Sequence, residues 1–175
     1  MRREILIWPH PILKQKALPV DAVDSGIQTL VRDMFETMYA AKGVGLAAPQ
    51  VGVLQRVIVL DTRPRQPDSR PIAMVNPEII ATEGSTTYNE GCLSLPGEAE
   101  DVKRAARVSV RYLDEEGAPQ TLECDELLAI AVQHEIDHLD GTVFVDHLSS
   151  LKRQFIRKRM LRRQAEPDAP DAPAP

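Results

Sequence analysis

The sequence predicts an α+β fold, with strands grouped in the middle of the chain and helices at both ends. Short β-type runs fall between residues 56 and 123, whereas helical spacing of apolar residues occurs before and after them. Grouped strands, in place of strands that alternate with helices, favour α+β over a doubly wound parallel sheet. The 175 residues, 43% of them hydrophobic, suffice for one domain with its own core.

The first expected helix follows a capping signal. Ser25 and Gln28 have the spacing of a capping box, which predicts that a helix begins there. Gly43 is expected to end it, because glycine readily takes the left-handed conformation found after helix C-termini. The residues between them that keep helical spacing are Ile27, Leu30, Val31, Met34, Met38 and Ala41.

Five short segments rich in β-branched and aromatic residues are predicted to be strands. They are Arg56–Leu60, Ile72–Val75, Thr86–Tyr88, Arg107–Leu113 and Thr121–Glu123. The fourth alternates apolar with polar residues, as a half-exposed strand does, and the Glu-Glu-Gly sequence at 115–117 predicts the turn into the fifth. The loop Thr62–Arg70, which contains two prolines, is expected to be mobile.

A His-Glu-Ile-Asp-His motif that begins at His134 is the most informative feature of the chain. One helical residue turns about 100°, so Glu135 and His138 lie about 100° and 40° from His134, on one third of the circumference. Asp125 as N-cap and Gly141 as C-cap support a helix here. Two neutral imidazoles suit a divalent metal, and the adjacent carboxylate can take a proton from metal-bound water.

A catalytic site of this kind needs a third protein ligand. The downstream candidates are Asp140, Asp146 and His147, but the glycine-spaced continuation of the common metalloproteases is missing. Upstream, Cys92 would be a soft, strong ligand as a thiolate. The alternative for Cys92 is a buried reduced cysteine, the usual state of a lone cysteine.

The segment Gly43–Gly52 is rich in glycine and other small residues and contains one amide, Gln50. It has neither the Gly-Lys-Ser/Thr ending of a phosphate loop nor the spacing of a dinucleotide loop. Its glycines permit close approach of the backbone to a ligand. Gln50 can donate a hydrogen bond to a developing oxyanion.

Taken in order, these segments resemble the marker motifs of the peptide deformylases, G-x-G-L-A-A-x-Q, E-G-C-L-S and H-E-x-D-H. They occur here as Gly43–Gln50, Glu90–Ser94 and His134–His138, and the resemblance runs from the first helix to about residue 160. It implies small, mostly antiparallel β-sheets around a central metal-binding helix, with an N-terminal helix and a basic C-terminal helix. It also implies hydrolytic removal of the formyl group from the N-terminal formyl-methionine of newly synthesised polypeptides, which releases formate.

The expected site has three ligands for one divalent metal: Cys92, His134 and His138. Metal-bound hydroxide would attack the formyl carbon, while Glu135 takes the proton and returns it to the leaving amine. Gln50 and, as the resemblance implies, the backbone N–H of Leu93 would hold the oxyanion. The resemblance implies Fe²⁺ as the metal in the cell, and this ligand set also accepts Zn²⁺, Ni²⁺ or Co²⁺.

The methionine side chain of the substrate needs an apolar pocket beside the metal. Its expected lining is Leu127, Ile130, Ala131, Gly43, Val44 and Gly45. Ordinary core packing is the alternative for Ile130. Two roles are open for Glu90 and for Asp137. Each can accept a hydrogen bond from a ligand histidine or form a structural ion pair with Arg104.

One stretch departs from the family pattern. Residues 97–101 read Gly-Glu-Ala-Glu-Asp, where many family members carry a basic residue that helps to hold the nascent peptide. Recognition of the extended peptide is therefore expected to be weaker or different, with the core chemistry unchanged.

Charge is unevenly distributed along the chain. Residues 1–148 contain 14 basic and 23 acidic residues, whereas Ser149–Ala165 contains seven basic residues and no acidic one. A solvated face is the common explanation of a charge run, but acidic residues usually mix into such faces. We expect this helix to dock on the ribosome through phosphate contacts that are salt-dependent and not sequence-specific.

The remaining expectations concern domain limits and compartment. A catalytic domain at residues 1–165 would be followed by a disordered, acidic, Pro/Ala-rich tail at 166–175. No apolar run approaches the about 18 residues of a membrane span, so no membrane partner is expected. Two cysteines on different elements favour a reduced, cytoplasmic protein.

Two other functions fit part of the sequence. A zinc endopeptidase would keep the H-E-x-x-H motif, leave Cys92 and Gln50 without a role, and cleave unformylated peptides internally. A zinc-stabilised binding module would need a closed four-ligand site with Cys124 as the fourth ligand. Cys124 precedes His134 by ten residues, or about 15 Å along one helix, which disfavours that site.

Overall fold

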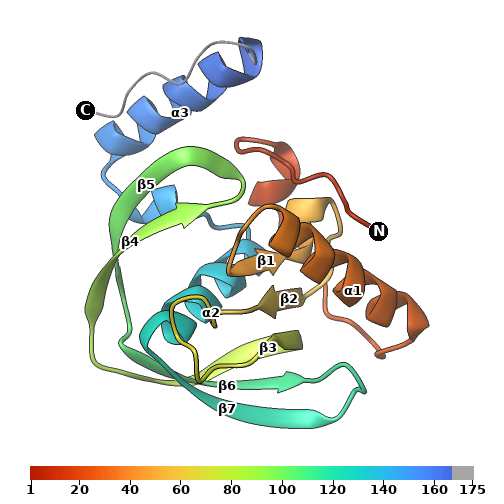
Figure 1. Ribbon diagram of the computed structural model, residues 1–175. Helices are drawn as coiled ribbons and strands as arrows, with labels where there is room; N and C mark the ends of the chain where they lie inside the picture. The colour runs from red at the N-terminus through yellow and green to blue at the C-terminus, as the bar shows by residue number, and fades with distance from the viewer. Residues whose placement is uncertain (167–175) are drawn as a thin grey trace.

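The computed structural model describes residues 1–166 and has the α+β architecture expected from the sequence (Figure 1). Its elements are η1 (Pro11–Lys14), α1 (Ser25–Ala40), β1 (Gly45–Ala47), η2 (Ala48–Val51), β2 (Val57–Leu60), β3 (Ile72–Glu83), β4 (Thr86–Cys92), β5 (Leu95–Arg104), β6 (Arg107–Leu113), β7 (Pro119–Asp125), α2 (Glu126–Leu139), η3 (Phe144–His147) and α3 (Ser150–Ala165). The tail predicted at 166–175 lies outside the described residues, except for Glu166. None of the helices described is long and apolar enough to cross a membrane.

The strands within residues 1–166 form two antiparallel sheets. The larger has the order β1-β2-β3-β6-β7, and the smaller is the β4–β5 hairpin. A parallel bridge outside the named strands joins Leu18 to Gln55. The helix α2 lies between the two sheets (Figure 1), so the expectation of mostly antiparallel sheets around a central helix is confirmed.

The strand β2 is apolar along its whole length because both faces of the larger sheet are covered there. Ile58 and Leu60 belong to the core that includes α2, whereas Val57 and Val59 belong to the core that includes α1. Successive strand residues point to opposite faces, so α1 and α2 pack against opposite sides of this sheet. The central helix is therefore held by a sheet that is itself buried.

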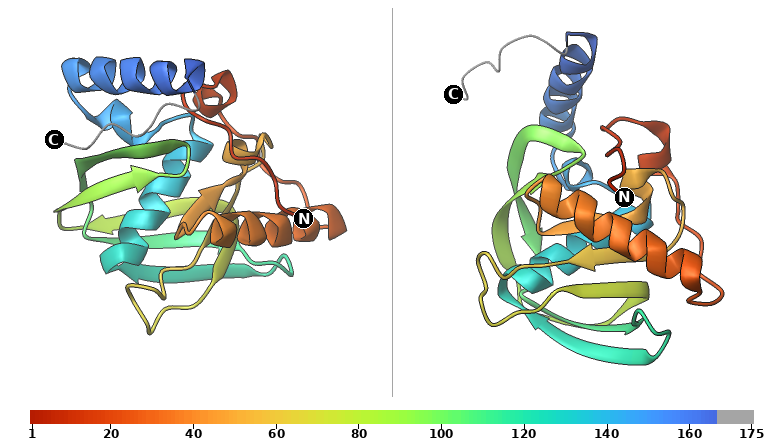
Figure 2. Two further views of the ribbon diagram at one scale, coloured as in Figure 1. Left: turned by 45° about the horizontal axis from the view of Figure 1, so that its top comes forward. Right: turned by 45° about the vertical axis from the view of Figure 1, so that its right-hand side comes forward.

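A third core links the N-terminal segment, β5, η3 and α3. The C-terminal helix contributes two buried residues to it, Ile156 and Met160, and otherwise runs along the outside of the β4–β5 hairpin (Figure 2). Helical spacing in the sequence predicts that Leu151 and Phe155 pack inward beside Ile156. That prediction is wrong, because Leu151 and Phe155 are 61% and 55% exposed. Phe155 is turned by about 100° from Ile156 around the helix axis, so it points away from the narrow face of α3 that contacts the rest of the protein.

Several predicted boundaries are also wrong. The helix α1 begins at Ser25 as predicted, but its N-cap is Asp24, whose side chain accepts from the Ile27 N–H, and it ends at Ala40, before the expected Gly43. The strand β3 continues to Glu83, and the sequence did not predict β1 or β5. Inward positions of β5 carry Glu98 and Arg104, which are buried in ion pairs, so this strand lacks the apolar alternation that identifies strands from sequence.

Candidate active site

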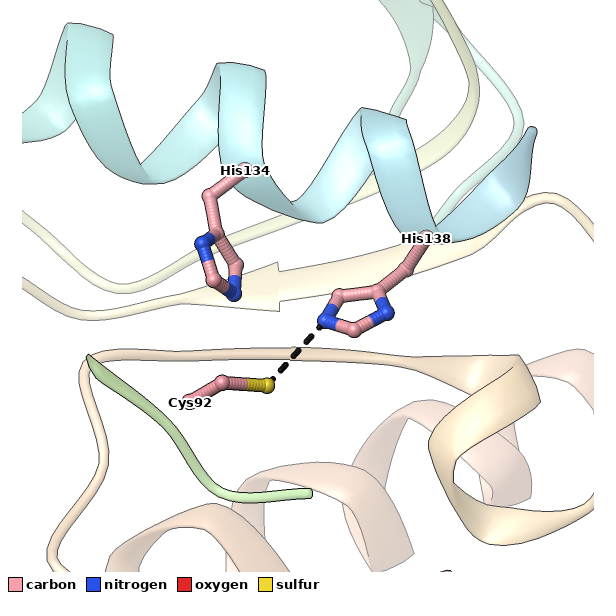
Figure 3. Close-up of side chains that lie close together, drawn as sticks. All are labelled: Cys92, His134 and His138. Atoms are coloured by element: carbon pink, nitrogen blue, oxygen red, sulfur yellow. Dashed lines mark hydrogen bonds between the residues drawn. The ribbon is translucent and has the colours of Figure 1, made fainter. Parts of the chain in front are cut away.

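Cys92, His134 and His138 come together between the end of β4 and the second half of α2 (Figure 3). One ligand-type atom from each residue lies within 4.8 Å of the others, and Cys92 Sγ is 3.3 Å from His138 Nε2. Both histidines are buried and extend from α2 toward the cysteine. Thiolate sulfur and imidazole nitrogen are typical donors for a divalent transition metal, so the three residues fit the expected ion.

A tight turn at the end of β4 presents the sulfur. Cys92 pairs with Leu95 across this turn. The carbonyl of Ser94 accepts a hydrogen bond of 2.8 Å from the Trp8 N–H, and Leu95 is fully buried. The turn is thus held from the N-terminal segment and from the core, which fixes where the thiol points.

A buried charge network behind His134 sets the tautomer of its ring. Glu90 Oε1 lies 2.8 Å from His134 Nδ1, and the two Glu90 oxygens accept from Arg104 at 2.8 and 2.9 Å. A carboxylate that accepts the Nδ1 proton leaves the Nε2 lone pair free for the cluster. Glu90 therefore has both roles that the sequence left open. Asp137 has only the structural one, since it contacts Arg104 and His147.

The two histidines have opposite shifts in pKa. Burial acts to lower the pKa of His134, but hydrogen bonds to Cys92 and Glu90 raise it well above its usual value. Burial lowers the pKa of His138 well below its usual value, and His138 Nδ1 has no hydrogen-bond partner in the part of the chain described. The acceptors that attract a proton to His134 would also attract a cation, and metal binding displaces such protons.

Glu135 lies beside the cluster and is shielded from solvent. The residue is 4% exposed, and its Oε2 has no hydrogen-bond partner among residues 1–166. Burial raises the pKa of Glu135 to about 7, so its carboxyl group can both accept and return a proton near neutral pH. Gly45 provides the space for it, because a Cβ there would lie 2.6 Å from Glu135 Oε1.

Gln50 is buried with its amide N–H groups facing the cluster. Its Oε1 accepts from the Ala47 N–H at 2.9 Å. Its Nε2 lies 3.1 Å from Ser94 Oγ and 3.6 Å from Cys92 Sγ. The carbonyl end is therefore anchored, and the donor end is beside the sulfur.

A cleft of about 440 Å³ opens from the cluster to solvent. The six residues expected to line a pocket all line this cleft: Gly43, Val44, Gly45, Leu127, Ile130 and Ala131. Leu93 lines it too and packs against Gly43, where a Cβ would lie 2.6 Å from Leu93 Cδ1. Ile130 is buried as well, so core packing and cleft lining coexist at that position.

The other candidate ligands lie elsewhere. Asp140 forms an ion pair with Arg56, and Asp146 accepts from the Val143 N–H at the start of η3. Cys124 is on β7 and not on the helix that carries His134, and burial raises the pKa of its thiol to about 12. Neither aspartate nor this cysteine belongs to the ligand-type cluster found within residues 1–166.

The acidic stretch after Pro96 contacts the basic helix, a link that sequence reasoning missed. Glu98 accepts from Arg159 at 2.9 and 2.8 Å and lies 3.3 Å from Arg163. Glu100 pairs with Lys152 at 3.0 Å. The opposite charges of the two segments were the available signal, but nothing in the sequence showed that they meet.

The fold and the site together define a class of protein. A central helix brings two histidines into one cluster with a cysteine from a strand end, and a buried glutamate of the same helix lines the adjoining cleft. Three such donors beside a proton-accepting carboxylate are typical of a mononuclear metallohydrolase.

Comparison with known proteins gives the family. The polypeptide deformylase family model matches residues 2–154. The chain is 53% identical over 157 residues to a peptide deformylase of Alkalilimnicola ehrlichii, covering 90% of this chain and 88% of that protein. Among solved structures, it is similar to a peptide deformylase from Legionella pneumophila, with 44% identity, a TM-score of 0.89, and coverage of 97% of this chain and 100% of that one. A peptide deformylase from Ehrlichia chaffeensis in complex with actinonin is 38% identical with a TM-score of 0.89, covering 94% of this chain and 98% of that one.

The chain therefore belongs to the polypeptide deformylase family, as the three sequence motifs indicated, and is a hydrolase.

Proposed function

We propose that this chain hydrolyses the formyl amide of N-formylmethionyl peptides and releases formate and the free amine. The observation that carries the proposal is the position of buried Glu135 beside the Cys92, His134 and His138 cluster, at the inner end of a partly apolar cleft. Membership of the deformylase family supports the choice of substrate.

Cys92, His134 and His138 would hold one divalent metal, with Fe²⁺ as the ion in the cell and Zn²⁺, Ni²⁺ or Co²⁺ able to replace it. When bound, such a metal acidifies water and polarises the formyl oxygen. The chain supports this arrangement through Glu90, which fixes the ring of His134, and through burial, which favours neutral His138.

Glu135 is the proton carrier in this proposal. Its carboxylate takes a proton from the attacking water as the new C–O bond forms at the formyl carbon. It then gives that proton to the amide nitrogen as the C–N bond breaks, so that methionine leaves as an amine. General acid–base catalysis of this kind contributes about 10²- to 10⁴-fold.

Gln50 and Leu93 would stabilise the negative charge that develops on the formyl oxygen. Gln50 Nε2 already faces the cluster, and the backbone N–H of Leu93 follows the cysteine in the same turn. One well-placed donor is worth about 3–4 kcal/mol in such a transition state. The methionine side chain would occupy the apolar part of the cleft, lined by Leu127, Ile130 and Ala131 opposite the Gly43–Gly45 segment.

The exposed face of α3 supports a proposal about where the enzyme acts. Four cations of this helix face carboxylates of the domain: Lys152, Arg153, Arg159 and Arg163. Arg157, Lys158 and Arg162 form no ion pair with the described residues and are exposed. We propose that these three contact ribosomal RNA phosphates, so that the enzyme meets nascent chains in the cytoplasm.

Charge reversal tests the ribosome proposal. Replacing Arg157, Lys158 and Arg162 by Glu should abolish co-sedimentation with ribosomes at low salt, while hydrolysis of short formyl peptides continues at the wild-type rate. Unaltered co-sedimentation would refute the docking role.

A paired-substrate assay tests the function itself. The metal-loaded protein should release formate from formyl-Met-Ala-Ser and leave acetyl-Met-Ala-Ser intact. A zinc endopeptidase would instead cut internal peptide bonds whatever blocks the N-terminus. Cleavage of both peptides at similar rates would therefore contradict the proposal.

A further inference from the structure

The rim of the active-site cleft carries two cations, Lys42 and Arg65, from separate parts of the chain. Lys42 follows α1, and Arg65 lies in the loop between β2 and β3. Both residues are exposed. Within residues 1–166 neither forms an ion pair.

The carboxylates that line the same cleft are buried, and two of them already have cationic partners. Glu90 is paired with Arg104, and Glu98 is paired with Arg159. Glu135 also lines the cleft but is only 4% exposed, so it does not contribute to the solvent-exposed rim. The solvent-exposed part of the lining therefore has an uncompensated positive charge.

Arg65 is fixed at the rim by hydrogen bonds. Its Nη1 donates to the hydroxyl of Tyr88, a cleft residue on β4, at 2.7 Å. The neighbouring Gln66 ties the loop to the start of α2, because its side chain accepts from the Leu128 N–H at 3.2 Å and donates to Asp125 at 3.3 Å. A guanidinium group has five N–H donors, so most of them stay free for another acceptor.

We propose that Lys42 and Arg65 determine specificity, by favouring formyl-methionyl peptides with an acidic side chain at the second or third residue. The inference rests on the proposed function, since a methionine side chain in the cleft would lead the following residues out over this rim. A free guanidinium can bind a carboxylate through two parallel hydrogen bonds, and an ammonium adds a second positive charge. An exposed ion pair changes an equilibrium by about 1.4- to fivefold, so two cations together supply a preference of about twofold to at most about 25-fold.

Matched peptide pairs test this specificity. We would compare formyl-Met-Asp-Ala-amide with formyl-Met-Asn-Ala-amide, and formyl-Met-Ala-Asp-amide with formyl-Met-Ala-Asn-amide. The C-terminal amides remove the other carboxylate. At low salt, kcat/KM of the metal-loaded wild type should be about fivefold higher for the acidic member of at least one pair, mainly through a lower KM. In about 0.5 M NaCl the preference should fall below about twofold, because exposed charges are then screened.

Three variants locate the effect. Arg65→Gln and Lys42→Gln should each lower the ratio of acidic to amide substrate, and Tyr88→Phe should lower it partly by releasing Arg65. Arg70→Gln is the matched control, because Arg70 is an exposed cation of the same loop that does not line the cleft, and it should keep the wild-type ratio.

The outcomes separate the two proposals. Hydrolysis of the asparagine peptides reports deformylation itself, and its absence would overturn both the proposed function and this inference. Hydrolysis without an acidic preference in the wild type would overturn the inference alone. So would a preference that survives in both Arg65→Gln and Lys42→Gln.

Discussion

The helices α2 and α3 are similar in length, but the fold holds them by different means. Ten of the 14 residues of α2 are buried, whereas two of the 16 residues of α3 are. The polar groups of α2 face a closed network, in which Glu90 and Arg104 stand behind His134. The polar groups of α3 face solvent or form exposed ion pairs, such as the one between Lys152 and Glu100.

The difference shows which functional groups the fold positions rigidly. Truncation of a buried apolar side chain to alanine lowers the stability of a protein by about 2–5 kcal/mol, whereas loss of an exposed ion pair lowers it by about 0–1 kcal/mol. Groups on α2 should therefore be sensitive to single substitutions, and groups on α3 should tolerate them. Catalysis needs fixed geometry, while contact with a polyanion needs only charge at the surface.

The largest effect is expected at the acid–base residue of α2. Glu135→Gln should keep its metal, since Glu135 is not one of the proposed ligands, and should lose about 10³-fold in kcat. Turnover of formyl-Met-Ala-Ser and metal content would be measured on the same preparation. Activity within about tenfold of wild type would remove Glu135 from the mechanism.

The two cysteines offer the next test. Cys92→Ser should weaken metal binding by at least about tenfold, because it removes a proposed ligand. Cys124→Ser is the matched control: it changes a buried thiol of β7, outside the cluster, and should keep full metal content. Equal metal content after dialysis in the two variants would show that Cys92 is not a metal ligand.

In the metal-free protein, the burial of Glu135 should make the free energy of unfolding depend on pH. Its pKa is 4.5 in a free side chain and about 7 in the fold, so the folded state holds more protons than the unfolded state between these values. Stability of the metal-free protein should therefore fall as pH rises through this window, by about 2 kcal/mol. Glu135→Gln cannot ionise, so its free energy of unfolding relative to that of wild type should rise by about this amount between pH 5 and pH 8, a range that includes most of the window.

Urea unfolding at several pH values would measure this difference. Arg157→Gln, on the exposed helix, should follow the wild-type pH dependence and serves as the control. A difference between Glu135→Gln and wild type that does not change with pH would mean that Glu135 is ionised in the fold already at pH 5.

The smallest effect is expected on α3. Arg159→Gln removes the hydrogen bonds to Glu98, yet Arg159 is half exposed, so the loss in stability should be at most about 1 kcal/mol. Arg157→Gln, which breaks no ion pair within the described residues, should be neutral. A loss of several kcal/mol for Arg159→Gln would show that this pair acts as part of the core and would break the contrast with α2.

Sequence predicted the relative placement of side chains where they are neighbours on one helix. Helical geometry alone places His134, Glu135 and His138 on one face. In the structure His134 and Glu135 line the cleft, and His138 joins His134 in the cluster with Cys92. The choice of Cys92 over downstream candidates needed the order of three motifs, because a contact between β4 and α2 depends on the whole chain path. The partner of His134 also stayed open, since Glu90 and Asp137 have the same chemistry and only the fold separates them.

Sequence did not predict the parts of the fold in which charged residues occupy buried positions that apolar residues usually fill. The strand β5 puts Glu98 and Arg104 at buried positions, and their partners lie 61 and 14 residues away. Periodicity cannot detect a strand whose inward side chains are paired ions. Leu151 and Phe155 show the reverse, because apolar residues at helical spacing remain exposed where the helix makes only a narrow contact.

Formate release measured against bound metal tests the central claim most directly. Metal would be removed from the wild-type protein and returned in known amounts, while formate from formyl-Met-Ala-Ser is measured. We expect release to stop without metal and to return in proportion to the ion bound, reaching its maximum at one ion per chain, as a single three-ligand site requires. Formate release that continues at the original rate in the metal-free protein would contradict the account.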